Sequence, residues 1–368
     1  MNRPVSRDNA PVPDRPERAR AHVTLDSVAR TAGVSAATAS RALNGTARVR
    51  EDLRERVLLA AEHLGYIPNA HAQALASAQS SVVGVICHDV GDPYFSAIAS
   101  GVMRAAAARH LMVMLASTFR EPAREVAYVS TLRAHRARAI LLIGSGFEDA
   151  DWERSMAAEL GPYVSGGGRV AAVSRHRSLR VDTVLPENRA GAAELARALI
   201  GLGHREFAVL TGPPSLTTVA DRLRGFRDAL AEHSIRLAAD QVVEGAFTRE
   251  GGYAATAELL ARGLRASCVF AVTDVMAVGA LAALRESGLR VPEDLSLAGF
   301  DDVPIVRDLT PPLTTVALPL ARMGETVLDL ALREPRGRRS RVERIAGEVL
   351  LRGSTAPWRG RTVPPGRG

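Results

Sequence analysis

The 368-residue sequence has no lysine, two cysteines and few aromatic residues. All 47 of its basic residues other than histidine are arginines, which a GC-rich gene would produce without any functional cause. Cys87 and Cys268 lie far apart in apolar runs, which predicts small core residues in a reducing cytosol rather than a disulfide. No cysteine or histidine pair has the spacing of metal ligands, so we expect neither a metal nor a cofactor.

The sequence also lacks long apolar runs and the motifs of several enzyme classes. No run is long enough to cross a membrane, and residues 1–22 contain no apolar signal-peptide segment. No GxGxxG, P-loop, GxSxG or HExxH motif supports a dehydrogenase, an NTPase, an α/β-hydrolase or a metalloprotease. We therefore expect a cytoplasmic, nucleoid-associated protein without membrane contact and without catalytic residues.

Charge is concentrated at one end of the chain. The formal net charge is +7, and the residues from 333 onward hold ten arginines against three glutamates, so this segment accounts for the whole excess. Residues 353–368 are therefore expected to form a flexible basic tail. Residues 1–22 are rich in Pro, Arg and Asp, which predicts a disordered N-terminal arm.

Residues 24–44 have the pattern of two short helices joined by a tight turn. Thr24 can cap the first helix, Gly33 can end it, and Ser35 can begin a second helix that reaches about Leu43. The apolar positions of the first helix recur at helical spacing: Leu25, Val28, Ala29 and Ala32. Helices joined so tightly cross steeply, as in a DNA-binding helix-turn-helix. A small helical hairpin that packs only against itself is the alternative.

Residues 51–64 predict a third helix that covers the first two, with Gly65 at its end and Pro68 beyond it. Around these helices, the segments VTLDSVARTAGVS, TASRALN and GYIPNAHAQALA follow one another in order. With this order and spacing, residues 23–80 resemble the headpiece and hinge of the LacI/GalR family of bacterial transcription regulators. The resemblance implies an all-α helix-turn-helix domain at residues 23–67 and a hinge at residues 68–80, which becomes a hinge helix only on the operator.

The same resemblance implies which residues contact DNA. Ala36 and Ala37 occupy base-reading positions of the second helix, but two methyl groups offer only apolar contact. Arg41, one turn further on, should therefore carry most of the hydrogen-bonded readout. Leu75 matches a leucine that is wedged into the minor groove to kink the duplex. The full set of implied DNA-binding residues is Thr24, Ser35, Ala36, Ala37, Thr38, Ser40, Arg41, Asn44, Tyr66, Asn69 and Leu75.

From Val82 onward, short apolar runs alternate with alanine-rich helical stretches. One series includes VVGVIC, RAILLIG and RVAAVS, and a second includes REFAVLTG, SCVFAVTD and DLSLAGFDD. Such alternation predicts βαβ units and parallel sheets. Residues 81–352 resemble the periplasmic sugar-binding-protein-like core of the same family, which implies an α/β core of two doubly wound parallel-sheet lobes with a ligand between them. The first lobe would comprise residues 81–185 and 314–333, and the second residues 186–313 and the last strands.

The resemblance also implies effector-binding residues in this cleft. Arg222 in DRLRGF matches a ligand-binding arginine, although an arginine on a helix surface is the alternative. Asp301 in GFDD matches an acid that accepts from ligand hydroxyls, with Asp302 as its structural neighbour. Phe247 matches an aromatic platform for a sugar ring or a base.

Two further features of the cleft leave alternatives open. Tyr94 and Phe95 would close the cleft from the first lobe, or could belong to its core. Thr273 stands where the family commonly has an asparagine, and VSRHRSLR lacks the usual aspartate. These departures leave the identity of the ligand open.

These features indicate a sequence-specific transcription regulator, usually a repressor, whose affinity for double-stranded operator DNA is controlled by a small carbohydrate effector. The alternative is a sugar-binding α/β protein or an enzyme that carries an accessory helical domain. The N-terminal segments favour the regulator, because a periplasmic sugar-binding protein would have a signal peptide and no helix-turn-helix. One headpiece reads one half-site, so we expect a homodimer on a pseudo-palindrome. The C-terminal residues cannot supply the leucine heptad of a tetramer.

Overall fold

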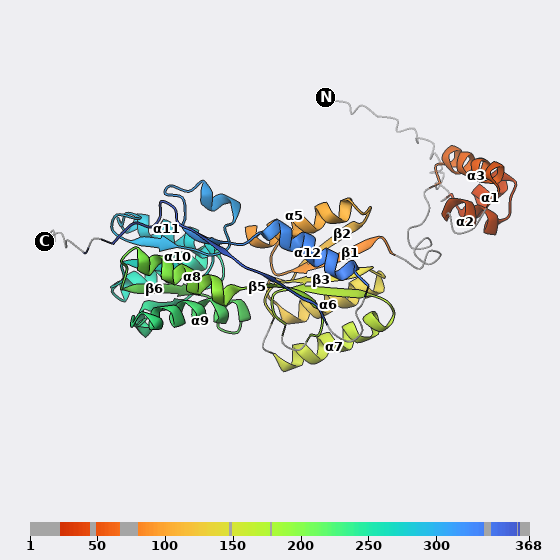
Figure 1. Ribbon diagram of the computed structural model, residues 1–368. Coiled ribbons are helices and arrows are strands. Elements are labelled where there is room, and N and C mark those ends of the chain that lie inside the picture. The colour runs from red at the N-terminus through yellow and green to blue at the C-terminus, as the bar shows by residue number, and fades with distance from the viewer. Residues whose placement is uncertain are drawn as a thin grey trace, which may run out of the picture. The chain divides into compact units, whose positions relative to one another are not determined.

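The computed structural model describes residues 23–44, 49–66, 80–146, 149–176, 179–334, 340–358 and 360 (Figure 1). The chain divides into two compact units, residues 1–79 and 80–368. The predicted N-terminal arm, residues 68–79 of the predicted hinge, and with them Asn69 and Leu75, lie outside the described residues.

The described residues of the first unit form three helices at the predicted places: α1 (Leu25–Ala32), α2 (Ala36–Asn44) and α3 (Glu51–Leu64). Thr24 caps α1, because its Oγ1 accepts a hydrogen bond from the backbone N–H of Ser27 at 3.3 Å. Gly33 ends α1 with a φ of 64°, a left-handed conformation that costs glycine least. Ser35 caps α2 by accepting from the N–H of Thr38 at 3.2 Å. The predicted boundaries and caps of the helix-turn-helix are confirmed.

Packing holds the third helix against the turn between the first two. Each helix contributes a fully buried side chain to one apolar core: Val28, Ala39 and Val57. Arg56 of α3 also donates hydrogen bonds to the carbonyl oxygens of Ala32 at 3.2 Å and Gly33 at 3.3 Å. Carbonyls at the end of a helix lack partners within the helix, so Arg56 satisfies groups that would otherwise need water.

The second unit consists of two α/β lobes, of which the first is built on a six-stranded parallel sheet in the order β11-β5-β4-β3-β1-β2. Its strands are β1 (Val82–Cys87), β2 (Met112–Ser117), β3 (Ala139–Ile143), β4 (Arg169–Val173), β5 (Asp182–Pro186) and β11 (Val342–Ile345). Its helices are α5 (Pro93–Ala107), α6 (Pro122–Ala134), α7 (Ala150–Ser165) and α12 (Leu320–Leu332). Val85 packs in the cluster of α5 and α12, whereas its neighbour Ile86 packs in the cluster of α6 and α7. Alternate residues of β1 thus bury both faces of the sheet under helices.

The second lobe has a four-stranded parallel sheet in the order β7-β6-β8-β9. Its strands are β6 (Phe207–Thr211), β7 (Val242–Glu244), β8 (Cys268–Ala271) and β9 (Ser296–Ala298). Its helices are α8 (Asn188–Gly201), α9 (Thr217–Glu232), α10 (Arg249–Ala261) and α11 (Asp274–Glu286), with short 3₁₀ turns η1 (Ala239–Gln241) and η2 (Pro304–Arg307). Cys87 in β1 and Cys268 in β8 are both buried and free, as predicted.

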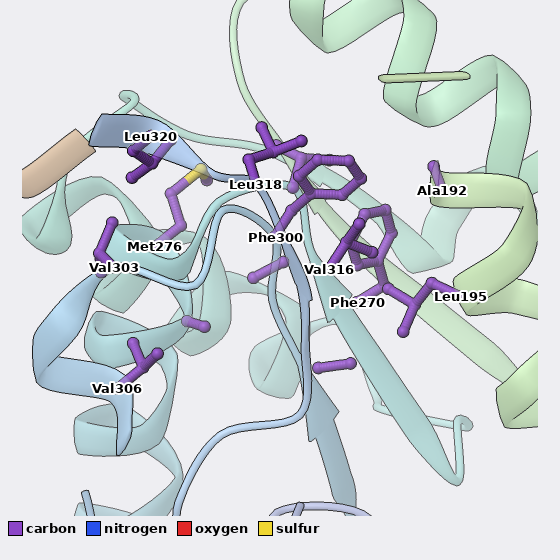
Figure 2. Packing of buried hydrophobic residues seen from close by; sticks show 14 of the residues in the cluster. Ala192, Leu195, Phe270, Met276, Phe300, Val303, Val306, Val316, Leu318 and Leu320 are labelled. Carbon is purple, nitrogen blue, oxygen red and sulfur yellow. The ribbon is translucent and has the colours of Figure 1, made fainter. Parts of the chain in front are cut away.

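The chain passes between the lobes three times. The crossings lie between β5 and α8, between β10 (Thr315–Ala317) and α12, and between β11 and β12 (Glu348–Leu350). Strands β10 and β12 pair antiparallel. Figure 2 shows Phe300 of the second lobe beside Val316 and Leu318, where the second crossing begins. All three residues belong to one apolar cluster that extends through both lobes, so the crossings are packed into the core rather than left as linkers.

Two expectations about the C-terminal part of the chain are wrong. Strand β11 pairs with β5 of the first lobe, not with the second lobe, because it follows α12 directly on that lobe. Of the predicted flexible tail, residues 353–358 are ordered, whereas residues 359 and 361–368 lie outside the described part of the chain. Ser354 is buried and its Oγ donates to Leu297 at 2.6 Å, while the N–H of Trp358 donates to Leu202 at 2.8 Å. The arginine content of the C-terminal residues predicted a solvated tail, but Ser354 and Trp358 anchor this segment to the second lobe.

A close contact between α5 and α12 gives the first testable prediction. A Cβ added to Gly101 of α5 would lie 2.0 Å from the backbone oxygen of Ala321 of α12. Because backbone cannot move aside as a side chain can, Gly101→Ala should destabilise the core by about 1–3 kcal/mol. Urea unfolding measures this loss. Gly201→Ala is the matched control, because no atom lies within 4 Å of that added Cβ. Equal stability of the two variants would contradict the tight helix contact.

Candidate functional site

The exposed face of α2 is the candidate DNA-binding surface. Ala36, Ala37 and Arg41 are exposed, whereas Ala39 and Ala42 of the same helix are buried against the other two helices. The Arg41 Nε donates to the carbonyl of Ala37 at 3.1 Å, which lays the side chain along this face. An exposed arginine between small side chains is free to reach an acceptor in a groove.

The remaining predicted DNA-binding residues divide into three groups. The hydroxyls of Thr24, Ser35 and Thr38 take part in hydrogen bonds at the helix starts. Ser40 and Tyr66 are both partly buried. Asn44 is the last residue of α2, and its side chain lies outside the described part of the structure, as do Asn69 and Leu75.

A pocket lies between the two lobes, at the carboxyl ends of their strands. The segments after β1, β2, β3 and β4 all contribute from the first lobe, among them with His88, Arg120, Ser145 and Ser174. The segments after β6, β7, β8 and β9 contribute from the second lobe: Thr218, Phe247, Thr273 and Asp301. Open α/β sheets bind ligands at this edge, and all six predicted effector-binding residues line the pocket: Tyr94, Phe95, Arg222, Phe247, Thr273 and Asp301.

An ion pair between Arg222 and Asp301 forms the floor of this pocket on the second lobe. The Arg222 Nη2 lies 2.6 Å from Asp301 Oδ1, and both side chains are almost fully buried. Arg222 also donates to Asn188 Oδ1 at 2.9 Å and to the carbonyl of Val272 at 2.7 Å. Its guanidinium lies 3.8 Å from the centre of the Phe300 ring. Arg222 is therefore a buried anchor and not the helix-surface arginine of the alternative interpretation.

Burial changes the pKa of the acid in this pair. It raises the pKa of Asp301 to about 6, and the positive charge of Arg222 opposes that increase. Three of the five guanidinium N–H groups of Arg222 have protein partners, so two donors and the second Asp301 oxygen remain for a ligand. The pair can offer both donors and an acceptor to adjacent hydroxyl groups.

Two further acids, Asp302 and Asp274, hold the loop that carries Asp301 in place. Asp301 and Asp302 both have positive φ, 119° and 56°, a conformation that Asp tolerates better than most side chains. Asp302 forms ion pairs with Arg307 and Arg352, each at 2.7 Å, which agrees with its expected structural role. Fully buried Asp274 accepts from the N–H of Val303 at 2.9 Å and from Thr315 Oγ1 at 2.7 Å. These bonds tie the loop to α11 and to strand β10.

Aromatic side chains enclose the pocket. Phe247 lines it from the second lobe. Tyr94 lies edge-on to Phe95, with ring centres 5.0 Å apart. Phe95 is 4% exposed and packs in the apolar cluster, so both interpretations hold for it: it lines the pocket and belongs to the core. Thr273 lines the pocket and caps α11 by accepting from the N–H of Met276 at 3.3 Å.

Sequence reasoning missed most of the first-lobe residues of the pocket. Among them, Ser145 donates to Thr218 Oγ1 across the lobes at 2.7 Å. His88 contacts Thr118 and the Ser145 carbonyl, and burial lowers its pKa to about 3, so it is uncharged at neutral pH. His88, Ser145 and Ser174 stand within two residues of the end of a strand, and this position was the signal that could have found them.

The chemistry of the pocket suits binding rather than reaction. It combines paired donors and acceptors with aromatic walls, which match the hydroxyl groups and the apolar faces of a sugar ring. Among the described residues, no group of three or more His, Cys, Asp and Glu side chains could hold a metal ion. In the same part of the chain, no helix is both long and apolar enough to span a membrane.

Comparisons with known proteins identify the family to which the chain belongs. A family model described as "Bacterial regulatory proteins, lacI family" matches residues 24–69, and a "Periplasmic binding protein-like domain" matches residues 196–355. The transcriptional regulator GalS of Salmonella typhimurium is 36% identical over 315 residues, which cover 86% of this chain and 91% of GalS. The ribose operon repressor of Haemophilus influenzae is 31% identical over 310 residues, covering 84% and 91%.

A solved structure, the lac repressor dimer bound to operator and the anti-inducer ONPF, matches with a TM-score of 0.79 and 27% identity. The match covers 91% of this chain and 99% of that chain. The similarity thus includes the helical unit and both lobes. These relatives are transcription regulators and not enzymes. The chain belongs to the lacI family of bacterial regulatory proteins.

Proposed function

We propose that this regulator binds operator DNA through the exposed face of α2, as a homodimer in the cytoplasm, and that a carbohydrate in the cleft controls this binding. The observation that carries the proposal is the Arg222–Asp301 pair, buried on the floor of a pocket to which both lobes contribute. A ligand there contacts both lobes, so its affinity depends on their arrangement. A ligand can shift a conformational equilibrium only through such a difference in affinity.

Two solved structures that are similar to this chain contain a bound sugar, which supports a sugar as the effector. One is a complex of the regulator CelR with cellobiose, and another is a lacI-family regulator of Enterococcus faecium with bound ribose. The cleft of this chain presents hydroxyl, carboxylate and guanidinium groups beside Phe247, which suits the same ligand class.

The experiment selects an operator from a random DNA library and then measures its affinity by fluorescence anisotropy with and without a panel of sugars. We expect a pseudo-palindromic motif, and at least one sugar that changes operator affinity by about 10-fold or more, the range of typical allosteric coupling. Selection that returns no motif would contradict operator recognition.

Arg41→Ala should cost about 1–3 kcal/mol of binding free energy per half-site and relax the sequence preference there. The reason is that Arg41 is exposed on α2 beside Ala36 and Ala37, whose methyl groups cannot donate hydrogen bonds to bases. Repeating the library selection measures the preference. Arg54→Ala on α3 removes the same charge and should keep the motif. An unchanged motif for Arg41→Ala would show that another residue reads the bases.

An apolar patch supports the homodimer. Strand β2 is at the edge of the first-lobe sheet, and its Met112 and Met114 are 67% and 37% exposed. Met103 on the adjacent α5 is also exposed. Exposed apolar patches of this kind mark protein–protein contacts, and Met112→Glu should shift the protein toward monomer in sedimentation analysis.

A further inference from the structure

The cleft contains one cation, Arg120, that has no acidic partner among the residues that the structure describes. Four residues of the pocket carry a formal charge: Asp92, Arg120, Arg222 and Asp301. Arg222 and Asp301 pair with each other at 2.6 Å. Asp92 caps α5, because it accepts from the N–H of Tyr94 at 2.9 Å. Among the described residues, no acidic side chain forms an ion pair with Arg120.

The guanidinium of Arg120 makes only weak contacts within the protein. Its Nη2 donates to the carbonyl of Phe247 at 3.4 Å, near the limit for a hydrogen bond. Its Nε is buried and has no hydrogen-bond partner. The group lies 5.4 Å from the centre of the Phe247 ring. Burial lowers the pKa of Arg120, while Asp92 and Asp89 oppose this from longer range. A partly buried cation with an unused donor is a costly arrangement in the absence of an acceptor.

The backbone conformation that places the Arg120 side chain in the cleft is itself energetically unfavourable. Phe119 and Arg120 follow β2 with φ values of 52° and 61°. Two consecutive side chains other than glycine in the left-handed region are uncommon, and such strain concentrates at functional sites. Bonds from the Phe119 N–H to the His88 carbonyl and from the Arg120 N–H to Thr118 Oγ1 hold the turn.

A helix start faces the same part of the cleft. Arg120, Phe247 and Thr248 line one groove that adjoins the main pocket. Thr248 is the cap of α10, and the N-terminus of a helix favours an anion nearby. The acids Asp89 and Asp92 also line this groove, and the Asp89 Oδ1 accepts from the N–H of Gly91 at 2.8 Å, a bond that orients the carboxylate and leaves its charge in place.

We propose that the effector is a carbohydrate bearing a carboxylate or phosphate group, and that Arg120 binds this group at the mouth of the cleft. The ring of the sugar would lie over Arg222 and Asp301, and its anionic substituent would supply the acceptors that Arg120 lacks. This inference rests on the proposed function and specifies its ligand class. A carboxylate and a phosphate share the geometry that a guanidinium binds with two N–H groups.

The first test compares the stability of the full chain without a sugar. We expect Arg120→Gln to melt at the same temperature as wild type or higher, since it removes a partly buried charge that has no acidic partner among the described residues. Inorganic phosphate, compared with chloride at equal ionic strength, should raise the melting temperature of wild type more than that of Arg120→Gln, because phosphate stabilises any folded protein to some extent. Arg249→Gln is the matched control, because this exposed arginine lines the same groove and already pairs with Glu250. A loss of stability in Arg120→Gln, or equal stabilisation of all three proteins by phosphate, would overturn the proposal.

The second test measures binding of sugar pairs by calorimetry. Glucuronate, galacturonate, glucose 6-phosphate and galactose 6-phosphate are compared with glucose and galactose. Loss of a charge-assisted hydrogen bond predicts that Arg120→Gln weakens an anionic ligand about 10- to 100-fold. Arg120→Lys should restore part of this affinity. Preference for the uronates or for the phosphate esters identifies the anionic group.

The outcomes separate this inference from the proposed function. A neutral sugar that changes operator affinity equally in wild type and Arg120→Gln would support the proposed function. It would overturn the proposal that the effector is anionic. If no sugar of the panel binds, the stability and phosphate measurements decide whether Arg120 binds an anion. A protein that selects no operator motif would contradict the proposed function, whatever Arg120 binds.

Discussion

Arg222→Ala is expected to lower the free energy of unfolding of the core by about 3–5 kcal/mol, in addition to abolishing the response to the effector. The substitution leaves the Asp301 carboxylate buried without its partner at 2.6 Å. It also removes the donors to Asn188 and to the Val272 carbonyl. Urea unfolding measures the first effect, and operator affinity with and without effector measures the second.

A charge-matched series separates the two effects of this substitution. Arg222→Met retains the apolar contact with Phe300 but leaves Asp301 unpaired, whereas Arg222→Met with Asp301→Asn removes both charges. The double variant should therefore be more stable than Arg222→Met alone, because no uncompensated charge remains. If the double variant is the less stable one, Asp301 contributes through bonds to the protein that do not involve Arg222.

Both variants should lose the response to the effector, because each lacks the guanidinium. An inducer should then fail to release the operator, and a co-repressor should fail to promote binding. Variants that bind the effector as tightly as wild type would show that the Arg222–Asp301 pair is not part of the effector site.

The sequence predicted this pair only in part. Both residues were expected from the motifs DRLRGF and GFDD, and both line the pocket. Neither motif indicated that the two side chains contact each other directly, from one and the same lobe. A motif shows which residue types recur, but the distance between two side chains depends on how α9 and the loop after β9 pack.

Other parts of the cleft had no signal in the sequence beyond their place after a strand. Arg120 reaches the pocket because two residues adopt positive φ, and nothing in STFRE predicts that conformation. Strand β11 was misplaced for a related reason. Its sequence VERI is half charged, and only its pairing with β5 shows that it extends the first sheet. Helix boundaries and caps depend on neighbouring residues, and these were predicted correctly in the first unit.

Asp274→Asn should stabilise the core, and increasingly so as pH rises. Burial raises the pKa of Asp274 to about 7, and the charge of Asp301 adds to this. The folded protein therefore holds a proton on Asp274 at pH values where the unfolded chain, with a pKa near 3.8, has lost it. The contribution of this group to stability is complete below about pH 4 and is lost as pH rises through 7. The advantage of the asparagine variant should grow by roughly 2–3 kcal/mol between pH 5 and pH 8.

The asparagine can keep both hydrogen bonds of the aspartate. Its carbonyl oxygen would accept from the N–H of Val303, and its NH₂ group would donate to Thr315 Oγ1, because a hydroxyl can also accept. Urea unfolding of wild type and variant at both pH values gives the difference, in which the other titrating groups cancel. Asp294→Asn is the control, since pairing with Arg290 lowers the pKa of Asp294 to about 2 and leaves it ionised throughout this range. Its stability difference from wild type should not change between pH 5 and pH 8. A constant difference for Asp274→Asn as well would mean that Asp274 is ionised in the folded core at pH 5, and that the loop after β9 is held by a carboxylate rather than by a neutral acid.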